Sequence, residues 1–169
     1  MKLLLDTPIA LWALSDDPRL TAETRELMCA TDNRIWVSVA SMWEVAIKRA
    51  IKPDKRPLSG VEFLHYCEQA GYESLPLRER HVAALESLPA IHADPFDRIL
   101  IAQAQAEALV FLTHDAMLAG YGGQVRLVSD HQATVGRGLC GRARAQGGPP
   151  RLCTSPCPAG APGCAALRT

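Results

Sequence analysis

Along the first 130 residues, short apolar runs alternate with segments of helical periodicity, and this alternation limits the fold more than any other feature. The clearest run is residues 109–113, Leu-Val-Phe-Leu-Thr, and the first is residues 2–5. Runs this short and this apolar are typical of strands that are buried on both faces. Because a helical segment separates each run from the next, the strands should pair in parallel. The sequence therefore predicts an α/β fold, a parallel sheet with helices on both faces.

The predicted elements begin with recognisable boundary signals. Thr7 and Pro8 suit the start of a helix, as an N-cap hydroxyl followed by a proline at the first helical position. Asp94 and Pro95 form the same kind of start before a strongly apolar helix. The predicted strands are residues 2–5, 34–38, 72–77, 109–113 and 125–128, and the predicted helices are residues 7–14, 21–30, 41–50, 61–70, 79–88 and 95–106.

Charge and composition divide the chain in two. Residues 1–130 hold all 18 acidic residues and 13 of the 18 basic ones, a net charge of −5, whereas residues 131–169 hold five arginines and no acid. The first part therefore lacks a broad basic surface for nucleic acid, and a polyanion would have to be held by metal and local basic groups. Residues 136–169 are dense in Gly, Pro, Ala, Arg and Cys without apolar periodicity. We predict one domain over residues 1–130 and a disordered tail over 131–169.

The sequence also bears on location. No apolar stretch reaches the roughly 18 residues that a membrane-spanning helix needs. Cys29 and Cys67 fall in helix-like segments and are interpreted as buried free thiols, which suits a reducing compartment. These features predict a cytoplasmic protein without a membrane partner.

Four acidic residues fall where a predicted strand has just ended or a helix has just begun: Asp6, Glu44, Asp97 and Asp115. In an open parallel sheet the carboxyl ends of the strands share one edge, and ligand sites form beyond it. Carboxylates crowded at that edge repel one another, and a hard divalent cation such as Mg²⁺ or Mn²⁺ relieves the repulsion. The pattern predicts a metal-dependent enzyme that acts on phosphate.

Each of these acids also has an ordinary structural explanation. Asp6 and Asp115 could cap the helical segments that follow them, and Glu44 falls in the first turn of its predicted helix, where the helix dipole favours an acid. Asp94 is the expected N-cap of the 95–106 helix, so that capping does not account for Asp97 as well. The joint occurrence of the acids at one sheet edge favours the functional interpretation.

Other residues give weaker signals. His92 and His114 lie near the same edge and are interpreted as neighbours of the metal ligands or as solvent-exposed groups, rather than as ligands. The tryptophans are interpreted as core residues rather than as platforms for base stacking; they are Trp12, Trp36 and Trp43. One basic run is the best candidate for contact with a phosphate backbone, and it comprises Lys48, Arg49, Lys52, Lys55 and Arg56.

Four sequence blocks spread over residues 1–130 carry a family pattern. They are Leu-Leu-Leu-Asp-Thr at 3–7 with Leu-Trp-Ala-Leu at 11–14, Ser-Val-Ala-Ser-Met-Trp-Glu-Val-Ala-Ile-Lys at 38–48, Asp-Pro-Phe-Asp-Arg-Ile-Leu-Ile-Ala-Gln-Ala at 94–104, and Leu-Thr-His-Asp at 112–115. In this order the blocks resemble the PIN-domain ribonuclease toxins of VapBC toxin–antitoxin modules, that is, VapC-like proteins.

The resemblance implies a three-layer PIN-like fold with a five-stranded parallel sheet, RNA cleavage that depends on Mg²⁺ or Mn²⁺, a cognate antitoxin and a homodimer. Its acidic quartet carries over to Asp6, Glu44, Asp97 and Asp115, with Asp94 as an accessory acid. We expect Asp6, Asp97 and Asp115 to bind metal directly. Glu44 is expected to bind a second ion or to orient the attacking water.

One departure from the family pattern leaves alternatives open. The family often has a histidine directly after the Asp-Thr pair, where this chain has Pro8, so any hydrogen bond that the histidine makes beside the metal is lost. One alternative is therefore a catalytically impaired PIN-fold module that binds RNA or antitoxin. Another is a receiver-type or phosphatase protein with an Asp nucleophile. The phosphatase would need a second Asp two residues after Asp6, where Pro8 stands.

Overall fold

The computed structural model describes residues 1–55 and 58–128, and the predicted tail lies outside the described residues. Five strands form one sheet in the order β3-β2-β1-β4-β5, with every pairing parallel. The strands are β1 (Lys2–Leu5), β2 (Arg34–Ser38), β3 (Glu73–Leu75), β4 (Val110–Thr113) and β5 (Val125–Leu127). The predicted α/β fold with a five-stranded parallel sheet is confirmed.

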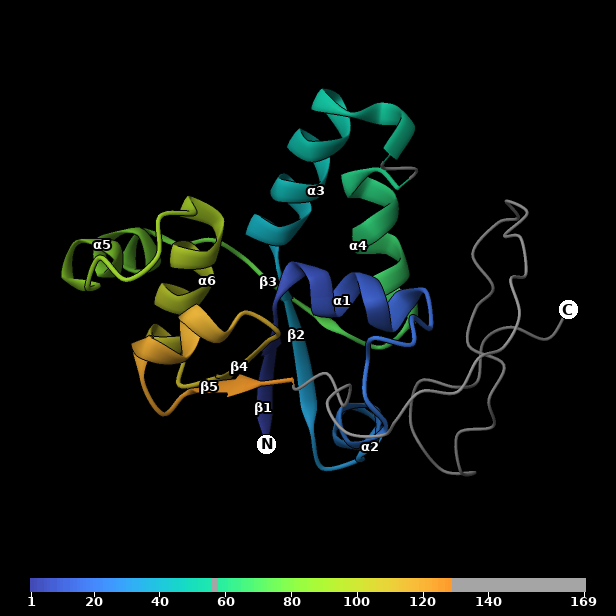
Figure 1. Ribbon diagram of the computed structural model, residues 1–169, viewed down its shortest axis with the longest axis horizontal. Helices are drawn as coiled ribbons and strands as arrows, with labels where there is room; N and C mark the ends of the chain where they lie inside the picture. Colours follow the sequence, from blue (N-terminus) through green and yellow to red (C-terminus); the bar gives the residue numbers. More distant parts are fainter. Residues whose placement is uncertain (56–57, 129–169) are drawn as a thin grey trace, which may run out of the picture.

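Helices cover both faces of this sheet, giving three layers. They are α1 (Thr7–Leu14), α2 (Ala22–Cys29), α3 (Val39–Ile51), α4 (Gly60–Gln69), α5 (Glu79–Ser87) and α6 (Pro95–Ala106), with short 3-10 helices η1 (Pro53–Lys55) and η2 (Ala116–Tyr121). Figure 1 shows α1, α2 and α4 on one side of the sheet and α5 and α6 on the other. Among the described residues, no helix combines the length and apolar character that crossing a membrane requires.

Alternate residues of β1 supply the two halves of the core. Leu3 and Leu5 pack on the side of α1 and α4, in a cluster that includes the fully buried Phe63. Leu4 points the other way, into a cluster with Phe111 and residues of α6. All three leucines of β1 are fully buried, as expected for the central strand of a doubly covered parallel sheet. The burial of these apolar side chains is the main stabilising contribution to the fold.

The register of β1 determines where the strands end. Leu5 pairs with Val37 of β2 on one side and with Leu112 of β4 on the other. The three strands therefore reach the same edge of the sheet at almost the same level. Residues that follow them directly, Asp6 above all, are delivered to that edge.

Helix α3 differs from the sequence prediction in its start and in its buried face. It begins at Val39, two residues earlier than predicted, because the hydroxyl of Ser38 accepts a capping hydrogen bond from the N–H of Ala40 at 2.9 Å. The prediction that Trp43 is a core residue is wrong, since 56% of its surface is exposed. Trp12, by contrast, is buried.

One cysteine prediction is also wrong. Cys67 is buried within α4, and burial raises the pKa of its thiol to about 12. Cys29, at the end of α2, is exposed. Helix α2 packs Leu27 and Met28 against the core with both side chains only partly buried, and Thr24 is its one buried residue.

Candidate active site

Asp6 follows β1 directly and is buried, with 2% of its surface exposed. Its backbone N–H donates to the carbonyl of Leu112 at 2.9 Å, so the pairing with β4 continues up to this residue. Although Asp6 is the N-cap residue of α1, its side chain makes no capping hydrogen bond. Its Oδ2 instead accepts a hydrogen bond from the hydroxyl of Thr113 at 2.6 Å. Helix capping therefore does not account for this buried carboxylate.

Thr113, the last residue of β4, joins two of the predicted site residues. Its fully buried hydroxyl donates to Asp6 and accepts the backbone N–H of Asp115 at 3.1 Å. Asp115 caps η2, since its Oδ1 accepts from the N–H of Met117 at 2.8 Å. Sequence reasoning had not singled out Thr113. The available signal was a single hydroxyl residue that ends an otherwise apolar strand.

Helix α6 brings Asp97 to the same edge. The helix begins as predicted, with Pro95 in its first turn and with Asp94 as the N-cap, whose Oδ1 accepts from the N–H of Phe96 at 2.8 Å. Since Asp94 supplies the cap, the carboxylate of Asp97 in the first turn is available for another contact. Its Oδ2 lies 3.1 Å from Nδ1 of His92.

Glu44 reaches the site from α3 and is 5% exposed. Because α3 begins at Val39, Glu44 lies in the second turn and not the first, so the favourable helix dipole predicted for it is missing. Its Oε1 accepts a hydrogen bond from Nζ of Lys48, one helical turn later. Its negative charge raises the pKa of both Asp6 and Asp97. The four predicted acids are therefore electrostatic neighbours.

The imidazole of His92 lies between two of these carboxylates. Its Nδ1 is 3.1 Å from Oδ2 of Asp97, and its Nε2 is 3.4 Å from Oδ2 of Asp115. The three residues each offer one potential ligand atom, and these atoms all lie within 4.8 Å of one another. The other histidine at this edge, His114, is exposed, with Nδ1 4.0 Å from Oδ2 of Asp6 and its ring packed edge-on against Trp12.

Two carboxyl groups of the site bind their protons unusually tightly. Burial raises the pKa of Asp6 to about 6. The hydrogen bond from Thr113 and the nearby backbone N–H of Thr7 oppose this rise, and the charges of Glu44 and Asp115 add to it. Burial also raises the pKa of Asp97 to about 7, and the charge of Asp6 adds to that effect. Removing both charged carboxylates from water without a cation is costly.

Some buried side-chain oxygens among the described residues also lack a hydrogen-bond donor beside them. Within residues 1–55 and 58–128, three buried side-chain oxygens have no hydrogen-bond partner: Oδ1 of Asp6, Oγ1 of Thr7 and Oγ of Ser41. Such orphaned groups are rare in folded proteins and indicate a bound water or ion. The donor set fits Mg²⁺ or Mn²⁺, because both ions prefer carboxylate oxygens.

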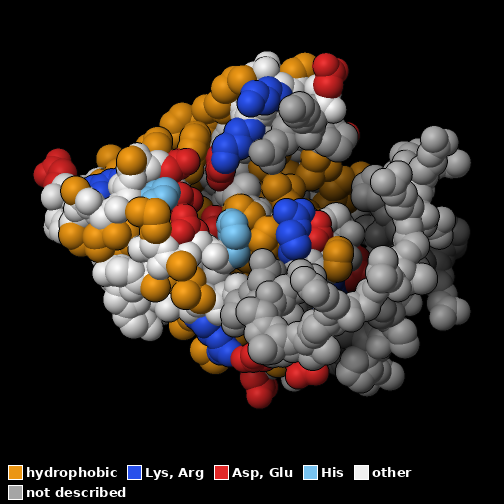
Figure 2. All heavy atoms as spheres, in the orientation of Figure 1, with side chains coloured by type: hydrophobic (Ala, Val, Ile, Leu, Met, Phe, Trp, Pro, Cys, Tyr) orange, Lys and Arg blue, Asp and Glu red, His pale blue; other side chains and the backbone are white. Residues whose placement is uncertain are grey.

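Acidic, basic and histidine side chains lie close together on this face (Figure 2). Figure 2 shows acidic and histidine side chains beside one another at the centre of the face, with Lys and Arg side chains on α3 above them. Trp43 packs edge-on against Phe96, with ring centroids 5.0 Å apart, and thereby connects α3 to α6.

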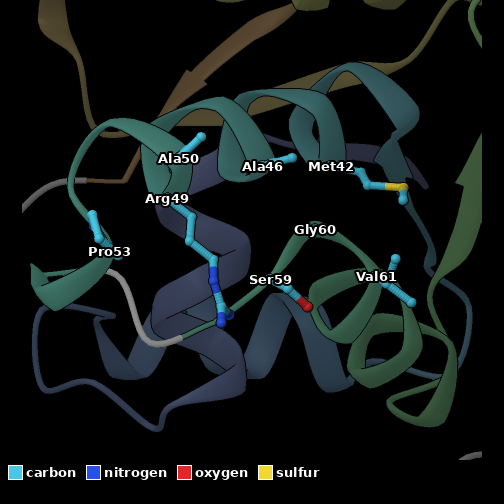
Figure 3. Close-up of a pocket in the computed structure, with 8 residues that line it drawn as sticks. All are labelled: Met42, Ala46, Arg49, Ala50, Pro53, Ser59, Gly60 and Val61. Atoms are coloured by element: carbon cyan, nitrogen blue, oxygen red, sulfur yellow. The ribbon is translucent and has the colours of Figure 1, made fainter.

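An apolar groove runs between α3 and the start of α4, away from the acids. Figure 3 shows the side chains that line it, which are Met42, Ala46, Arg49, Ala50, Pro53, Ser59, Gly60 and Val61. The helices approach closely at Gly60, where an added Cβ would lie 2.8 Å from the carbonyl oxygen of Met42. The lining residue Val61 is 70% exposed, and Ile51, the last residue of α3, is 68% exposed.

The fold and the site together define a class of protein: an open parallel α/β domain with acids gathered at the carboxyl edge of its sheet. Residues 3–123 match the family model described as the PIN domain, so the chain belongs to the PIN domain family. Proteins of this family are generally nucleases and typically use a divalent metal. Membership in this family does not support the alternative of a receiver-type or phosphatase protein.

Solved structures with the same fold come from bacteria and an archaeon. VapBC2 from Rickettsia felis, bound to a DNA fragment from its promoter, has a TM-score of 0.57 at 16% identity, covering 75% of this chain and 97% of that one. A domain of a functionally unknown protein from Methanocaldococcus jannaschii has a TM-score of 0.52 at 16% identity, with 82% and 99% covered. FitAcB from Neisseria gonorrhoeae has a TM-score of 0.51 at 16% identity, with 78% and 99% covered. Among curated proteins there is no match.

Proposed function

We propose that this chain is a divalent-metal-dependent endoribonuclease that acts as the toxin of a toxin–antitoxin module. The observation that carries the proposal is Oδ1 of Asp6, a buried carboxylate oxygen without a partner in the described structure. It lies within electrostatic reach of Glu44, Asp97 and Asp115. A divalent cation would compensate for both the orphaned oxygen and the mutual repulsion of the acids.

The residues have distinct proposed roles. Asp6, Asp97 and Asp115 hold the metal, and Thr113 orients two of these ligands through its hydroxyl. Glu44, whose Oε1 accepts from Lys48, orients the attacking water or binds a second ion. A bound Mg²⁺ or Mn²⁺ would supply a water of lowered pKa and would stabilise negative charge on the scissile phosphate. Asp94 remains an accessory acid that caps α6.

We propose a cognate antitoxin as the protein partner. The likeness to VapBC2 supports such a partner, and the groove between α3 and α4 is the surface on which we propose that it binds. Val61 and Ile51 offer exposed apolar contacts, Lys52 at the C-cap of α3 adds positive charge, and Arg49 lines the groove while paired with Glu62 of α4. These features suit an amphipathic helix that has an apolar stripe and acidic flanks. We also expect a cytoplasmic homodimer, which light scattering and cell fractionation would test.

The decisive experiment is a cleavage assay on the purified full chain. Single-stranded and structured RNA, and single-stranded DNA as a comparison, are incubated with Mg²⁺, with Mn²⁺ or with EDTA. We expect RNA cleavage that EDTA abolishes and that Asp6→Asn eliminates. Glu86→Gln is the matched control, since Glu86 is an exposed acid on α5 and its substitution should leave cleavage unchanged.

Each outcome of this assay has a definite meaning. Cleavage that persists in EDTA, or full activity of Asp6→Asn, would refute the metal mechanism. Binding of metal without any cleavage would instead support the catalytically impaired module, and Pro8→His would then test whether proline at this position is the cause. Cleavage of DNA in preference to RNA would leave the protein a nuclease but would contradict the proposed substrate.

A further inference from the structure

We propose that the imidazole of His92 is itself a ligand of the divalent cation, together with Asp97 and Asp115, and that this nitrogen makes the site prefer a transition-metal ion over Mg²⁺. The inference rests on the proposed function, because it concerns the same metal. It goes further by adding a ligand outside the acidic quartet and by specifying which class of cation the site selects.

The distances support ligation by His92 rather than mere proximity. Its two ring nitrogens face oxygens of two different carboxylates, at 3.1 Å for Asp97 and 3.4 Å for Asp115. A histidine that binds a metal through one nitrogen commonly has its other nitrogen hydrogen-bonded to a carboxylate or a backbone group. Nδ1 of His92 is the engaged nitrogen, beside Asp97 and the backbone N–H of Asp94, so Nε2 is the nitrogen that would bind the metal. All three candidate ligand atoms lie within 4.8 Å of one another.

Both the ring and the backbone of His92 are held before any metal binds: the backbone N–H of Asp94 donates to Nδ1 of the ring at 3.3 Å. The backbone N–H of His92 donates to the phenolic oxygen of Tyr121 at 3.1 Å. Arg98 donates to that same oxygen at 3.4 Å and to the carbonyl of Pro89 at 3.0 Å. The side chain of His92 is only 17% exposed. A ring fixed in this way loses little freedom on binding a metal, which is what a preformed ligand requires.

Each neighbouring carboxylate has one oxygen that faces the ring, Oδ2 of Asp97 and Oδ2 of Asp115. Oδ1 of Asp115 is engaged by the N–H of Met117, whereas its Oδ2 is the atom nearest His92. A second sign of a missing ligand is independent of this contact: the buried Oδ1 of Asp6 has no partner among the described residues, and the charge of Asp6 acts on Asp97. Positive charge at this position would therefore satisfy several groups at once.

The chemical class of the cation follows from the nitrogen. Mg²⁺ binds almost entirely to oxygen, whereas imidazole is a good ligand for Mn²⁺ and a better one for Co²⁺, following the general order of affinity of the divalent ions. A site of carboxylates alone would gain little from replacing Mg²⁺ with Co²⁺. The ratio of the two affinities therefore reports on His92.

The test measures metal binding to the full chain without RNA. The dissociation constants of Mg²⁺ and Co²⁺ are obtained by titration calorimetry for the wild type, His92→Gln and His65→Gln. His65 is exposed on α4, so its variant controls for metal bound by surface histidines. We expect His92→Gln to weaken Co²⁺ binding by roughly tenfold or more while Mg²⁺ binding changes much less, because glutamine offers an oxygen in place of the nitrogen. His65→Gln should behave as the wild type.

A second measurement keeps the inference testable if His92→Gln fails to fold. In the wild type, Co²⁺ should shift the ring proton resonances of His92 more strongly than those of His65 in an NMR titration. If His92→Gln binds Co²⁺ as tightly as the wild type does, with the same ratio of Co²⁺ to Mg²⁺ affinity, the inference is overturned and the nuclease proposal stays intact. Ring resonances of His92 that do not shift with Co²⁺ would have the same meaning. Failure of the wild type to bind either ion would overturn both.

Discussion

Replacing Asp6 with asparagine should remove a pH-dependent destabilisation of the metal-free protein. Asp6 is 2% exposed, and its pKa is raised from 3.8 to about 6, chiefly because burial disfavours the charged form. The folded state therefore holds its proton more tightly than the unfolded state. Between pH 4 and pH 6 the unfolded chain has already released the proton while the folded chain keeps it. Stability due to Asp6 is greatest below this window and falls as the pH rises through it.

The size of the effect follows from the shift. A pKa difference of about two units corresponds to roughly 3 kcal/mol of unfolding free energy, lost between pH 4 and pH 6 and constant above that. Asp6→Asn has no charge to bury, and its amide oxygen can still accept from Thr113. The amide nitrogen, however, becomes a buried donor, which costs about 1–3 kcal/mol at every pH. Whatever the difference in unfolding free energy between the two proteins at pH 4, it should change in favour of the variant by up to roughly 3 kcal/mol as the pH rises.

The assay is urea unfolding in EDTA at intervals from pH 4 to pH 8, followed by circular dichroism. Asp97, whose pKa is raised to about 7 in part by the charge of Asp6, contributes a slope of the same sign that is smaller in the variant. The difference between the two curves therefore reports the carboxylate of Asp6 together with its effect on Asp97. Adding Mn²⁺ at pH 7.5 should stabilise the wild type more than Asp6→Asn. Parallel curves from pH 4 to pH 8 would show that the carboxylate of Asp6 is not buried as described.

Three further substitutions test the packing by urea unfolding at pH 7. Phe63→Ala should lower the free energy of unfolding by about 3–5 kcal/mol, because the fully buried ring leaves a cavity; a loss below about 1 kcal/mol would contradict its place in the core. Ala108→Gly should raise it by about 0.5–1 kcal/mol, because a φ of 52° strains any residue with a Cβ, and a loss of stability would argue against that conformation. Gly60→Ala should lower it by roughly 1–3 kcal/mol, because the new Cβ would meet the carbonyl of Met42 at 2.8 Å; a neutral result would mean that α3 and α4 separate easily.

The centre of the sheet was predictable because β1 and β4 are short apolar runs buried on both faces, whereas the edge strands β3 and β5 are polar in part and less buried. Such runs carry their own boundaries, and parallel pairing follows from the helices between them. The same topology explains why Asp6 and Asp115 could be placed at one edge without any coordinates. Asp6 directly follows β1, and Asp115 comes two residues after the end of β4. The two strands are neighbours whose register aligns Leu5 with Leu112, so both acids reach the same edge.

The buried face of α3 could not be predicted from hydrophobicity alone, because it mixes the apolar Ala40 and Val45 with polar residues. Its buried residues include Ser41 and Glu44, which border the acidic edge, while Trp43 and Ala46 are exposed. The apolar residues at helical spacing, Trp43, Ala46 and Ala50, therefore lie on the outer side of the helix, and Ala46 and Ala50 line the groove toward α4. Polar residues therefore face the acidic edge on one side of α3, and apolar residues line the groove on the other, so that hydrophobicity does not mark the buried face.

The position of His92 was hidden for a different reason. It lies in the irregular segment between α5 and α6, where no periodicity fixes the direction of a side chain. Its contacts depend on Tyr121 and Arg98, which are distant from it in the chain or lie on the following helix. The sequence indicated a histidine near the acids but could not indicate that its ring stands between Asp97 and Asp115.

The hydrogen bond between Thr113 and Asp6 has a consequence for the order in which the protein is made. The two residues are 107 positions apart, yet they lie on neighbouring strands in the middle of the sheet. During synthesis Asp6 leaves the ribosome early, and one side of β1 stays without its neighbour until β4 has been translated. The acidic edge therefore cannot be completed while the chain is still short. A nascent chain halted before Val110 should show no stabilisation by Mn²⁺, so a cell would meet the finished site only once nearly all of the described domain has emerged.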